Sequence, residues 1–296
     1  VSSFTVLGKV LLNFFEPSTL LVVAYGASAL VLMLFFGALP ELKKIFLLSK
    51  RSFFALLVMS LLASAAAPLL MYQGLKITSA TNAILIAPME FVLTGLVAMI
   101  WLRERITSQQ LMGIVVMLAG VSAIITRGFS IQLEAANGGD LLVLGATMVW
   151  ALSNNIFKKY LSHVSPELVV MFRNGLGALV VFILSVFLLG ESHDFQSLLS
   201  GDALWPMVAF VVVTILLGQT LWFKSLELIP ATRASTIALS SPFFAIFYAQ
   251  IFLDEPLLGY HLVGGTLVII GLTFTVLHRQ RHPDHALHQK VKDLHR

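Results

Sequence analysis

The sequence predicts an all-α integral membrane protein of ten transmembrane helices, built as two inverted five-helix repeats, with the first helix lacking its beginning. Three observations predict this fold class. Of the 296 residues, 58% are hydrophobic and only 11% are charged, whereas a soluble domain carries about 25% charged residues. The apolar segments are continuous runs of the length that crosses a membrane as a helix, and the mean hydropathy is +0.91. Segments of the first half also recur in the second half.

Short polar breaks divide the chain into ten apolar runs, and each run is expected to form one helix. A helix of about 20 residues crosses the hydrocarbon core of a bilayer. The longest breaks read "PELKKIFLLSKRS", "GFSIQLEAANGGD" and "GESHDFQSLLSGD". The runs cover residues 1–14 (partial), 18–38, 53–75, 79–102, 107–126, 140–160, 166–189, 203–226, 231–253 and 258–277.

An internal repeat organises these runs. "EPSTLLVVAYGASALVL" at 16–32 matches "SPELVVMFRNGLGALVV" at 165–181, and "GLKITSATNAILIA" at 74–87 matches "SLELIPATRASTIA" at 225–238. Because each unit contains an odd number of helices, the second copy must insert upside down relative to the first. Many secondary transporters with this architecture hold their site at the midplane between the halves.

The repeat and the charges together predict the domains and their orientation. Lys and Arg residues between the runs fall mostly on one side of the membrane, and only Lys76 and Arg127 fall in loops on the other. Basic loops stay in the cytoplasm, so both termini are expected there, with the protein in the inner or plasma membrane of the cell. The predicted parts are a first repeat at 1–127, an extracytoplasmic connection at 128–139, a second repeat at 140–277 and a basic, histidine-rich cytoplasmic tail at 278–296.

Four segments in order carry a family resemblance. They are "SATNAILIAP" at 79–88, "WALSNNIFKKYLSHVSPELVVMFRNGLGAL" at 150–179, "ATRASTIALSSPFFAIF" at 231–247 and the pattern Glu-x8-Gly-x6-Gly in both halves. In these the chain resembles the drug/metabolite transporter superfamily, specifically the ten-helix EamA-type carriers. The resemblance implies two halves around a central cavity, export of amino acids or other small metabolites, and no cofactor. It also implies an arginine early in the second helix of each repeat, which Arg173 supplies in the second half while Ala24 stands in the first.

Glu90 is the residue that most directly indicates function. It lies near the middle of the run 79–102, where an ionised side chain costs at least about 2.5 kcal/mol and usually marks a pathway. Asn82, Glu90 and Thr94 are spaced by multiples of four, which predicts one polar stripe on a helix. Pro88 leaves a backbone carbonyl free on a nearby turn. We interpret Glu90 as a site for a substrate amine or a proton; the alternative is a structural acid that fixes helix packing.

The inverted counterpart of Glu90 is Ser241, within "LSSPF". Ser240 and Ser241 offer hydroxyl groups, Pro242 frees another carbonyl, and Tyr248 is expected on the same helix face as Ser241. These groups suit a polar or zwitterionic ligand. Close helix packing through the serines is an equally good interpretation.

Further candidates lie in the third, sixth, seventh and eighth runs. Pro68 interrupts the third run, and Gln219 is its counterpart in the eighth. Gln219 with Trp222, and Trp150 with Asn154, share helix faces and are candidate cavity walls, although ordinary aromatic packing explains the tryptophans as well. Arg173 is expected to neutralise a substrate carboxylate, to pair with Glu90 or to extend to the membrane boundary. Pro68, Pro88 and Pro242 are the expected helix hinges.

Two further groups of residues have expected structural roles. The glycine pairs, each seven residues apart, predict a close-packed seam between the fifth and tenth helices; they are Gly113, Gly120, Gly264 and Gly271. Glu104 and Glu255 are expected at helix ends as capping or solvated acids.

The function predicted from these residues is alternating-access export of a small amphipathic metabolite, an amino acid or a related compound, with coupling to protons through Glu90 as a hypothesis. Two alternatives remain open: a proton-coupled exporter of cationic drugs, and a non-transporting membrane subunit or lipid-handling partner. The chain lacks the signature motifs of phosphate-binding loops and hydrolases, so we expect no enzyme. We expect no metal site, no cofactor and no nucleic-acid partner. The expected partners are the substrate, the lipid bilayer and protons, and the expected state is a monomer or weak dimer.

Overall fold

The computed structural model describes residues 2–35, 48–101, 107–128, 135–187, 201–219, 241–253 and 255–279, together with 190, 191, 193, 195 and 221. Within these ranges the chain is helical apart from short connections, and every one of the ten predicted runs contains a described helix. Six stretches are long and apolar enough to cross a membrane, and two shorter apolar stretches, Gly201–Leu217 and Gly259–Phe274, accompany them. The predicted all-α membrane fold is confirmed.

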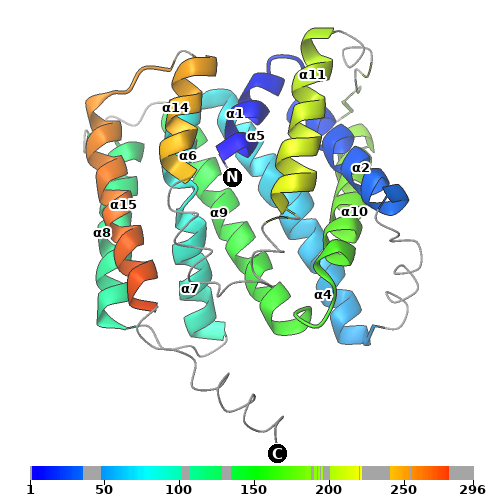
Figure 1. Ribbon diagram of the computed structural model, residues 1–296, viewed down its shortest axis with the longest axis horizontal. Coiled ribbons are helices and arrows are strands. Elements are labelled where there is room, and N and C mark those ends of the chain that lie inside the picture. The colour runs from blue at the N-terminus through cyan, green and yellow to red at the C-terminus, as the bar shows by residue number, and fades with distance from the viewer. Residues whose placement is uncertain are drawn as a thin grey trace, which may run out of the picture.

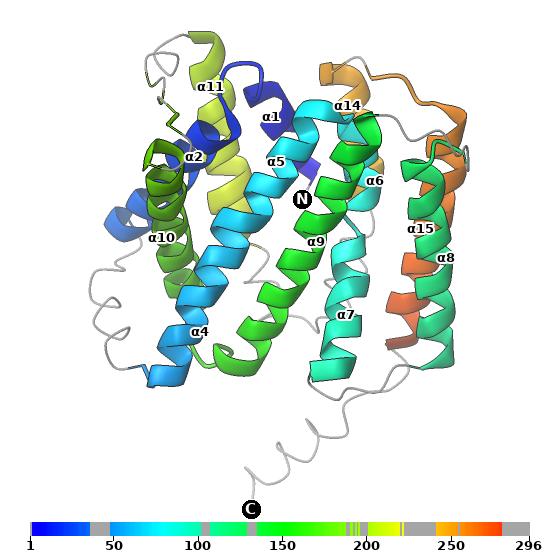
Figure 2. The ribbon, with the colours of Figure 1, turned by 180° about the vertical axis from the view of Figure 1, so that it is seen from behind.

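The helices run side by side along one direction (Figures 1 and 2). Connections α1–α2, α5–α6, α10–α11 and α14–α15 lie at one end, the upper end in Figure 1, which we call the α5–α6 end. The turn between α9 and α10 lies at the opposite, α9–α10 end. The helices are α1 Ser2–Leu11, α2 Pro17–Phe35, α4 Lys50–Leu61, α5 Ala67–Ile77, α6 Ala80–Ile86, α7 Met89–Trp101, α8 Ser108–Ile125, α9 Ala135–Tyr160, α10 Pro166–Phe187, α11 Gly201–Ala209, α14 Ser241–Leu253 and α15 Gly259–Arg279.

Two π-helical segments widen the backbone at matching places in the two repeats. The first, η1, spans Leu62–Ala66 between α4 and α5. The second, η3, spans Phe210–Leu217 after α11. The sequence repeat has an offset of about 150 residues, so η1 corresponds to positions inside η3. The repeat therefore extends from the amino-acid sequence to an irregularity of the backbone.

The run 79–102 is not the single helix that the sequence predicts. It consists of α6 and α7, with a break at Ala87 and Pro88. Pro88 has no N–H to donate to Ile84, so the regular helical hydrogen bonds are interrupted there although Ala87 keeps a helical conformation. The helix restarts through tighter bonds: the backbone N–H of Glu90 donates to the carbonyl of Ala87 at 3.0 Å. Glu90 thus lies in the first turn of a new helix.

The glycine seam joins α8 and α15. A Cβ atom on Gly120 would lie 2.7 Å from the backbone oxygen of Gly264, and one on Gly264 would lie 2.8 Å from that of Gly120. A Cβ on Gly271 would likewise meet the backbone of Gly113. Only glycine permits two helix backbones to approach this closely.

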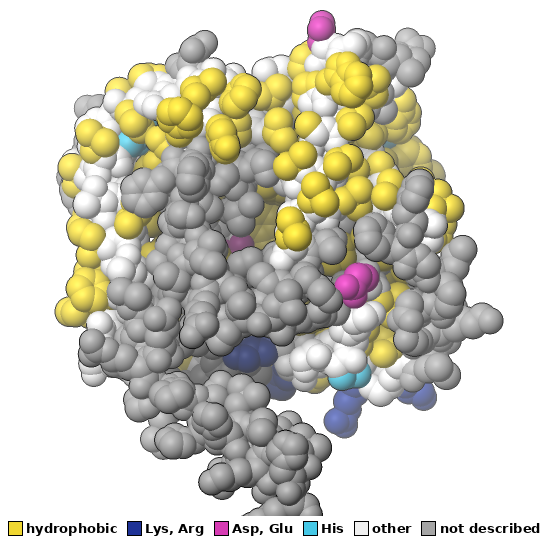
Figure 3. Space-filling model, viewed as in Figure 1, with side chains coloured by type: hydrophobic (Ala, Val, Ile, Leu, Met, Phe, Trp, Pro, Cys, Tyr) yellow, Lys and Arg dark blue, Asp and Glu magenta, His cyan; other side chains and the backbone are white. Residues whose placement is uncertain are grey.

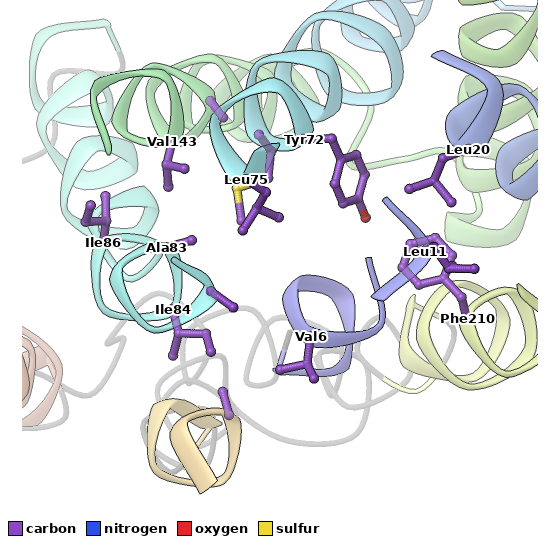
Figure 4. Close-up of a cluster of buried hydrophobic side chains, with 14 of the residues drawn as sticks. Val6, Leu11, Leu20, Tyr72, Leu75, Ala83, Ile84, Ile86, Val143 and Phe210 are labelled. Carbon is purple, nitrogen blue, oxygen red and sulfur yellow. The ribbon is translucent and has the colours of Figure 1, made fainter. Parts of the chain in front are cut away.

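Apolar side chains from several helices fill the interior. Figure 4 shows side chains of α1, α5 and η3 in this cluster, with Tyr72 of α5 pointing toward Leu11 of α1 and Phe210 of η3. Phe4 also lies among these helices: its ring is 5.2 Å from that of Tyr72 and 5.7 Å from that of Phe210. The short helix α1 is therefore packed on aromatic side chains of both repeats.

Candidate functional site

The Glu90 carboxylate receives a hydrogen bond from the neighbouring helix. The side-chain amide of Asn154, on α9, donates to Glu90 Oε1 at 2.7 Å and also lies 3.4 Å from Thr94 Oγ1. Asn155 donates to the backbone oxygen of Thr94 at 3.0 Å. Glu90 is half-buried and Asn154 is exposed. The structure thus brings together three sequence candidates, Glu90, Thr94 and Asn154, at the contact of α7 with α9.

Arg173 of α10 is a cation close enough to Glu90 for their charges to interact. The two side chains form no direct ion pair; the ion pair between described residues is Lys76 with Glu16. Arg173 is half-buried, and its Nε donates to Asn174 Oδ1 at 3.4 Å. An acid and a base therefore lie within reach of each other's charge, each held by a neutral amide.

Asn174 is a buried residue whose side-chain oxygen accepts the hydrogen bond from Arg173 Nε. Its amide donates to Ser28 Oγ of α2 at 3.1 Å, and its oxygen accepts from Ser64 Oγ of η1 at 3.3 Å. Gly177, one turn further along α10, lies against Ser64 so closely that a Cβ would meet it at 2.5 Å. Three elements thus meet around one amide, which limits the positions that Arg173 can take.

Trp150 is anchored by the π-helical turn before Pro68. The backbone N–H of Ala67 donates to Leu62, five residues back, and not to Ala63. Pro68 has no N–H, so the carbonyl of Ala63 is left free, and Trp150 Nε1 donates to it at 3.1 Å. The indole ring also contacts Phe4, with ring centres 5.9 Å apart. The expected hinge at Pro68 is thus a wide turn held by a tryptophan.

Asn82 does not share a stripe with Glu90, because the break at Pro88 ends the helix between them. Its side chain is 2% exposed and binds Asp140 and His261 near the α5–α6 end. Glu255 accepts from the backbone N–H groups of Ala80 and Thr81 at 2.7 and 2.8 Å. Glu255 therefore caps the start of α6. The sequence predicts either a capping or a solvated acid at this position.

The remaining candidates lie apart or outside the described residues. Ser240 and Trp222 are outside them, as are the side chains of Ser241 and Pro242 in the first turn of α14. Gln219 follows η3, and its Oε1 is buried with no hydrogen-bond partner among the described residues. Tyr248 is 41% exposed and contacts Phe247 and Phe252, which are more exposed still. The sequence predicts Tyr248 on the same helix face as Ser241, as a member of the site, and this stays a prediction.

Sequence reasoning missed the buried polar residues that hold the candidates in place. Asn155 directly follows the candidate Asn154, and Asn174 directly follows the candidate Arg173. Asp140 is a fully buried acid at the start of the sixth apolar run. Polar residues at such positions were the available signal. Their partners on other helices could not be read from spacing along a single helix.

Comparison with known proteins now identifies the family. The model of the EamA-like transporter family matches residues 1–126 and 137–277, which is nearly the whole chain. This chain belongs to the EamA-like transporter family. It is a multi-pass membrane transporter. The first matched segment covers α1 to α8, and the second covers α9 to α15.

Relatives and a solved structure agree with this assignment. "Uncharacterized transporter YyaM" of Bacillus subtilis strain 168 is 24% identical to this EamA transporter over 269 residues, 90% of this chain and 86% of that protein. "Uncharacterized transporter sll1164" of Synechocystis is 25% identical over 237 residues, 78% of this chain and 67% of that protein. A solved crystal structure superposes with a TM-score of 0.65 at 14% identity and covers 94% of this chain and 96% of that one. At this identity the likeness shows the fold.

Proposed function

We propose that this EamA transporter exports a small zwitterionic metabolite, an amino acid or a close relative, by alternating access. In this proposal Glu90 binds the ammonium group and Arg173 binds the carboxylate. The observation that carries it is the placement of the two charged side chains: Glu90 of α7 and Arg173 of α10 are half-buried, and each is hydrogen-bonded to a neutral amide and not to the other. A ligand with both charges completes two ion pairs at once, whereas a cationic drug would place its charge near Arg173.

Neighbouring side chains support this assignment. Asn154 leaves Glu90 Oε2 without a described partner, and Asn174 holds only the Nε of Arg173. The terminal nitrogens of the guanidinium group remain available for a bidentate contact, the geometry that arginine uses for carboxylates. Trp150, held through Ala63, is a wall for the apolar part of the ligand.

The charge distribution supports an orientation of the chain in the membrane. The α9–α10 end carries Lys50, Arg51, Lys158 and Lys159. In Figure 3, the Lys and Arg side chains that are visible on this face of the molecule lie toward its lower end, which is the α9–α10 end. By the positive-inside rule this end, where α15 also ends, faces the cytoplasm. The protein then resides in the cell membrane as a monomer or weak dimer, and the α5–α6 end faces outside.

Ligand analogues test the two charge contacts separately. A ligand that binds the folded state raises its melting temperature, so we would screen amino acids for stabilisation of the purified protein. For the best one, the N-acetyl and methyl-ester derivatives remove one charge each. Glu90→Gln should abolish the advantage of the free amine and keep that of the free carboxylate; Arg173→Gln should do the reverse. Stabilisation by lipophilic cations alone would support the drug exporter and reject the zwitterion.

Proton coupling through Glu90 needs a flux measurement. In proteoliposomes, an inward proton gradient should drive substrate in the opposite direction through the wild type. Glu90→Gln removes the titratable group, so substrate exchange without a gradient should survive better than gradient-driven flux. Equal losses in both assays, or none in either, would reject Glu90 as the coupling residue. Absence of any solute flux would favour a non-transporting role.

A further inference from the structure

A second set of buried polar groups crosses the molecule at the α5–α6 end. Asn82 of α6, Asp140 of α9 and His261 of α15 are 2%, 0% and 4% exposed. Asn82 belongs to the first repeat, and the other two belong to the second. None of these three residues takes part in the proposed substrate contacts at Glu90 and Arg173. Burying polar side chains costs free energy, so the burial of these three needs another explanation.

Hydrogen bonds join these groups in one direction. The backbone N–H of Leu258 donates to His261 Nδ1 at 3.0 Å. The imidazole must therefore carry its proton on Nε2, which lies 2.7 Å from Asn82 Oδ1. The amide of Asn82 then donates to both oxygens of Asp140, at 3.1 and 3.0 Å. Thr78 Oγ1 donates to the same carboxylate.

The ionised carboxylate of Asp140 makes this chain strongest. It accepts two bonds from Asn82 and one from Thr78, and hydrogen bonds to an ionised group are about twice as strong as bonds between neutral groups. A proton on Asp140 removes that charge and turns one carboxyl oxygen into a donor, which either faces the Asn82 amide or requires the Thr78 hydroxyl to accept. Both outcomes leave Asn82 with weaker bonds to Asp140, whereas a proton on His261 would break only the bond to Leu258.

We propose that Asp140, Asn82 and His261 form a latch that keeps the α5–α6 end closed, and that a proton taken up by Asp140 releases it. Asn82 and Thr78 of the first repeat donate to Asp140 of the second, beside the Asn82–His261 bond and the Glu255 cap of α6, and protonation of Asp140 weakens the bonds to its carboxylate. Lowering the pH therefore shifts the population toward an opening at this end. This proposal depends on the proposed function only in that the end opens during the transport cycle.

Other charged and titratable groups surround the latch. Arg127, after α8, favours the ionised carboxylate of Asp140, while Glu255 and Tyr260 lie near the imidazole side. Lys9 of α1 donates to the carbonyls of Leu75 and Thr78 at the end of α5. These groups set the pH range of release, but none of them replaces the Asn82–Asp140 bonds.

Spin-label distances test the latch without any substrate. The chain contains no cysteine, so Ile77→Cys with Leu257→Cys places two labels on exposed positions of the two repeats at this end. The wild type at pH 8 should show mainly the short distance, and acidification should populate a longer one. Asp140→Asn mimics the protonated acid and should raise the ratio of long to short roughly tenfold at pH 8, equal to about 1.4 kcal/mol.

Two matched variants control for folding and for the identity of the proton acceptor. His261→Gln can accept from Leu258 and donate to Asn82, as glutamine does in a capping box, so it should stay closed and keep the pH response. Thr78→Val removes one donor to Asp140 with little change of shape and should shift the ratio in the direction of Asp140→Asn. Wild-type distances in both Asp140→Asn and Thr78→Val would overturn the latch. A pH response lost in His261→Gln would overturn Asp140 as the acceptor.

Discussion

The side-chain amide of Asn154 lies 2.7 Å from the carboxylate of Glu90 and joins α9 to α7 directly after the helix break at Pro88. The break and the bond belong together. Because α7 begins after Pro88, Glu90 is in its first turn, where the positive end of the helix dipole favours a negative charge. Asn154 then fixes the direction of the carboxylate.

Asn154→Leu should therefore weaken substrate binding through Glu90. The change removes one hydrogen bond to a charged group, worth about 1.5–3 kcal/mol, and should raise the Kd roughly tenfold or more. Titration calorimetry with the ligand found by thermal stabilisation measures the effect. In the background of Glu90→Gln the same change should have a smaller effect, and equal effects in both backgrounds would reject the positioning role.

Trp150→Phe should lower the melting temperature, since it leaves the Ala63 carbonyl in the wide turn without its donor. An unsatisfied buried carbonyl costs about 1–3 kcal/mol. Trp101→Phe is the control, because the Trp101 ring is 39% exposed and stacks with Lys159 at the helix end. Equal melting temperatures for the two variants would show that the indole N–H does not stabilise the turn.

Gly120→Ala should destabilise the contact of α8 with α15. The new methyl group would meet the backbone of Gly264, and backbone cannot yield as a flexible side chain can, so we expect a loss of more than about 1 kcal/mol. Gly95→Ala is the matched control on α7, because a Cβ there meets nothing within 4 Å and should be neutral or stabilising. Thermal unfolding in detergent compares the two; similar curves would contradict the close approach.

Glu255→Ala should destabilise the start of α6. The carboxylate accepts from the N–H groups of Ala80 and Thr81 and from Thr81 Oγ1, and loss of such a cap costs about 0.5–2 kcal/mol. Hydrogen exchange followed by mass spectrometry should show faster exchange in α6, with little change in α7 beyond the break. Uniform exchange across both helices would argue against a local cap.

Much of the fold follows from the sequence because membrane helices satisfy their own backbone hydrogen bonds. Apolar length alone located ten runs, each of which contains a described helix, and the glycine spacing predicted a seam whose four residues lie at the contact of α8 with α15. The π-helical turns and the break in the fourth run were not predicted. Pro68 and Pro88 indicated weak points, but whether a proline leads to a wide turn or to two helices depends on which partner reaches the freed carbonyl.

The candidate site was predictable in its charged members and not in its partners. Glu90 and Arg173 stood out because a charged side chain within an apolar membrane run costs free energy. Asn82 was grouped with Glu90 on the assumption of an unbroken helix, while its partners Asp140 and His261 come from two other helices. Contacts between helices depend on rotation and depth, which the spacing of residues along one helix does not specify.

The matching positions of η1 and η3 give each repeat the same place at which to bend. In the proposed alternating-access cycle, a bend at one of these segments would open the molecule toward one side of the membrane, and a bend at the other would open it toward the opposite side. The duplicated π-helical segment gives both repeats the same backbone feature for that exchange.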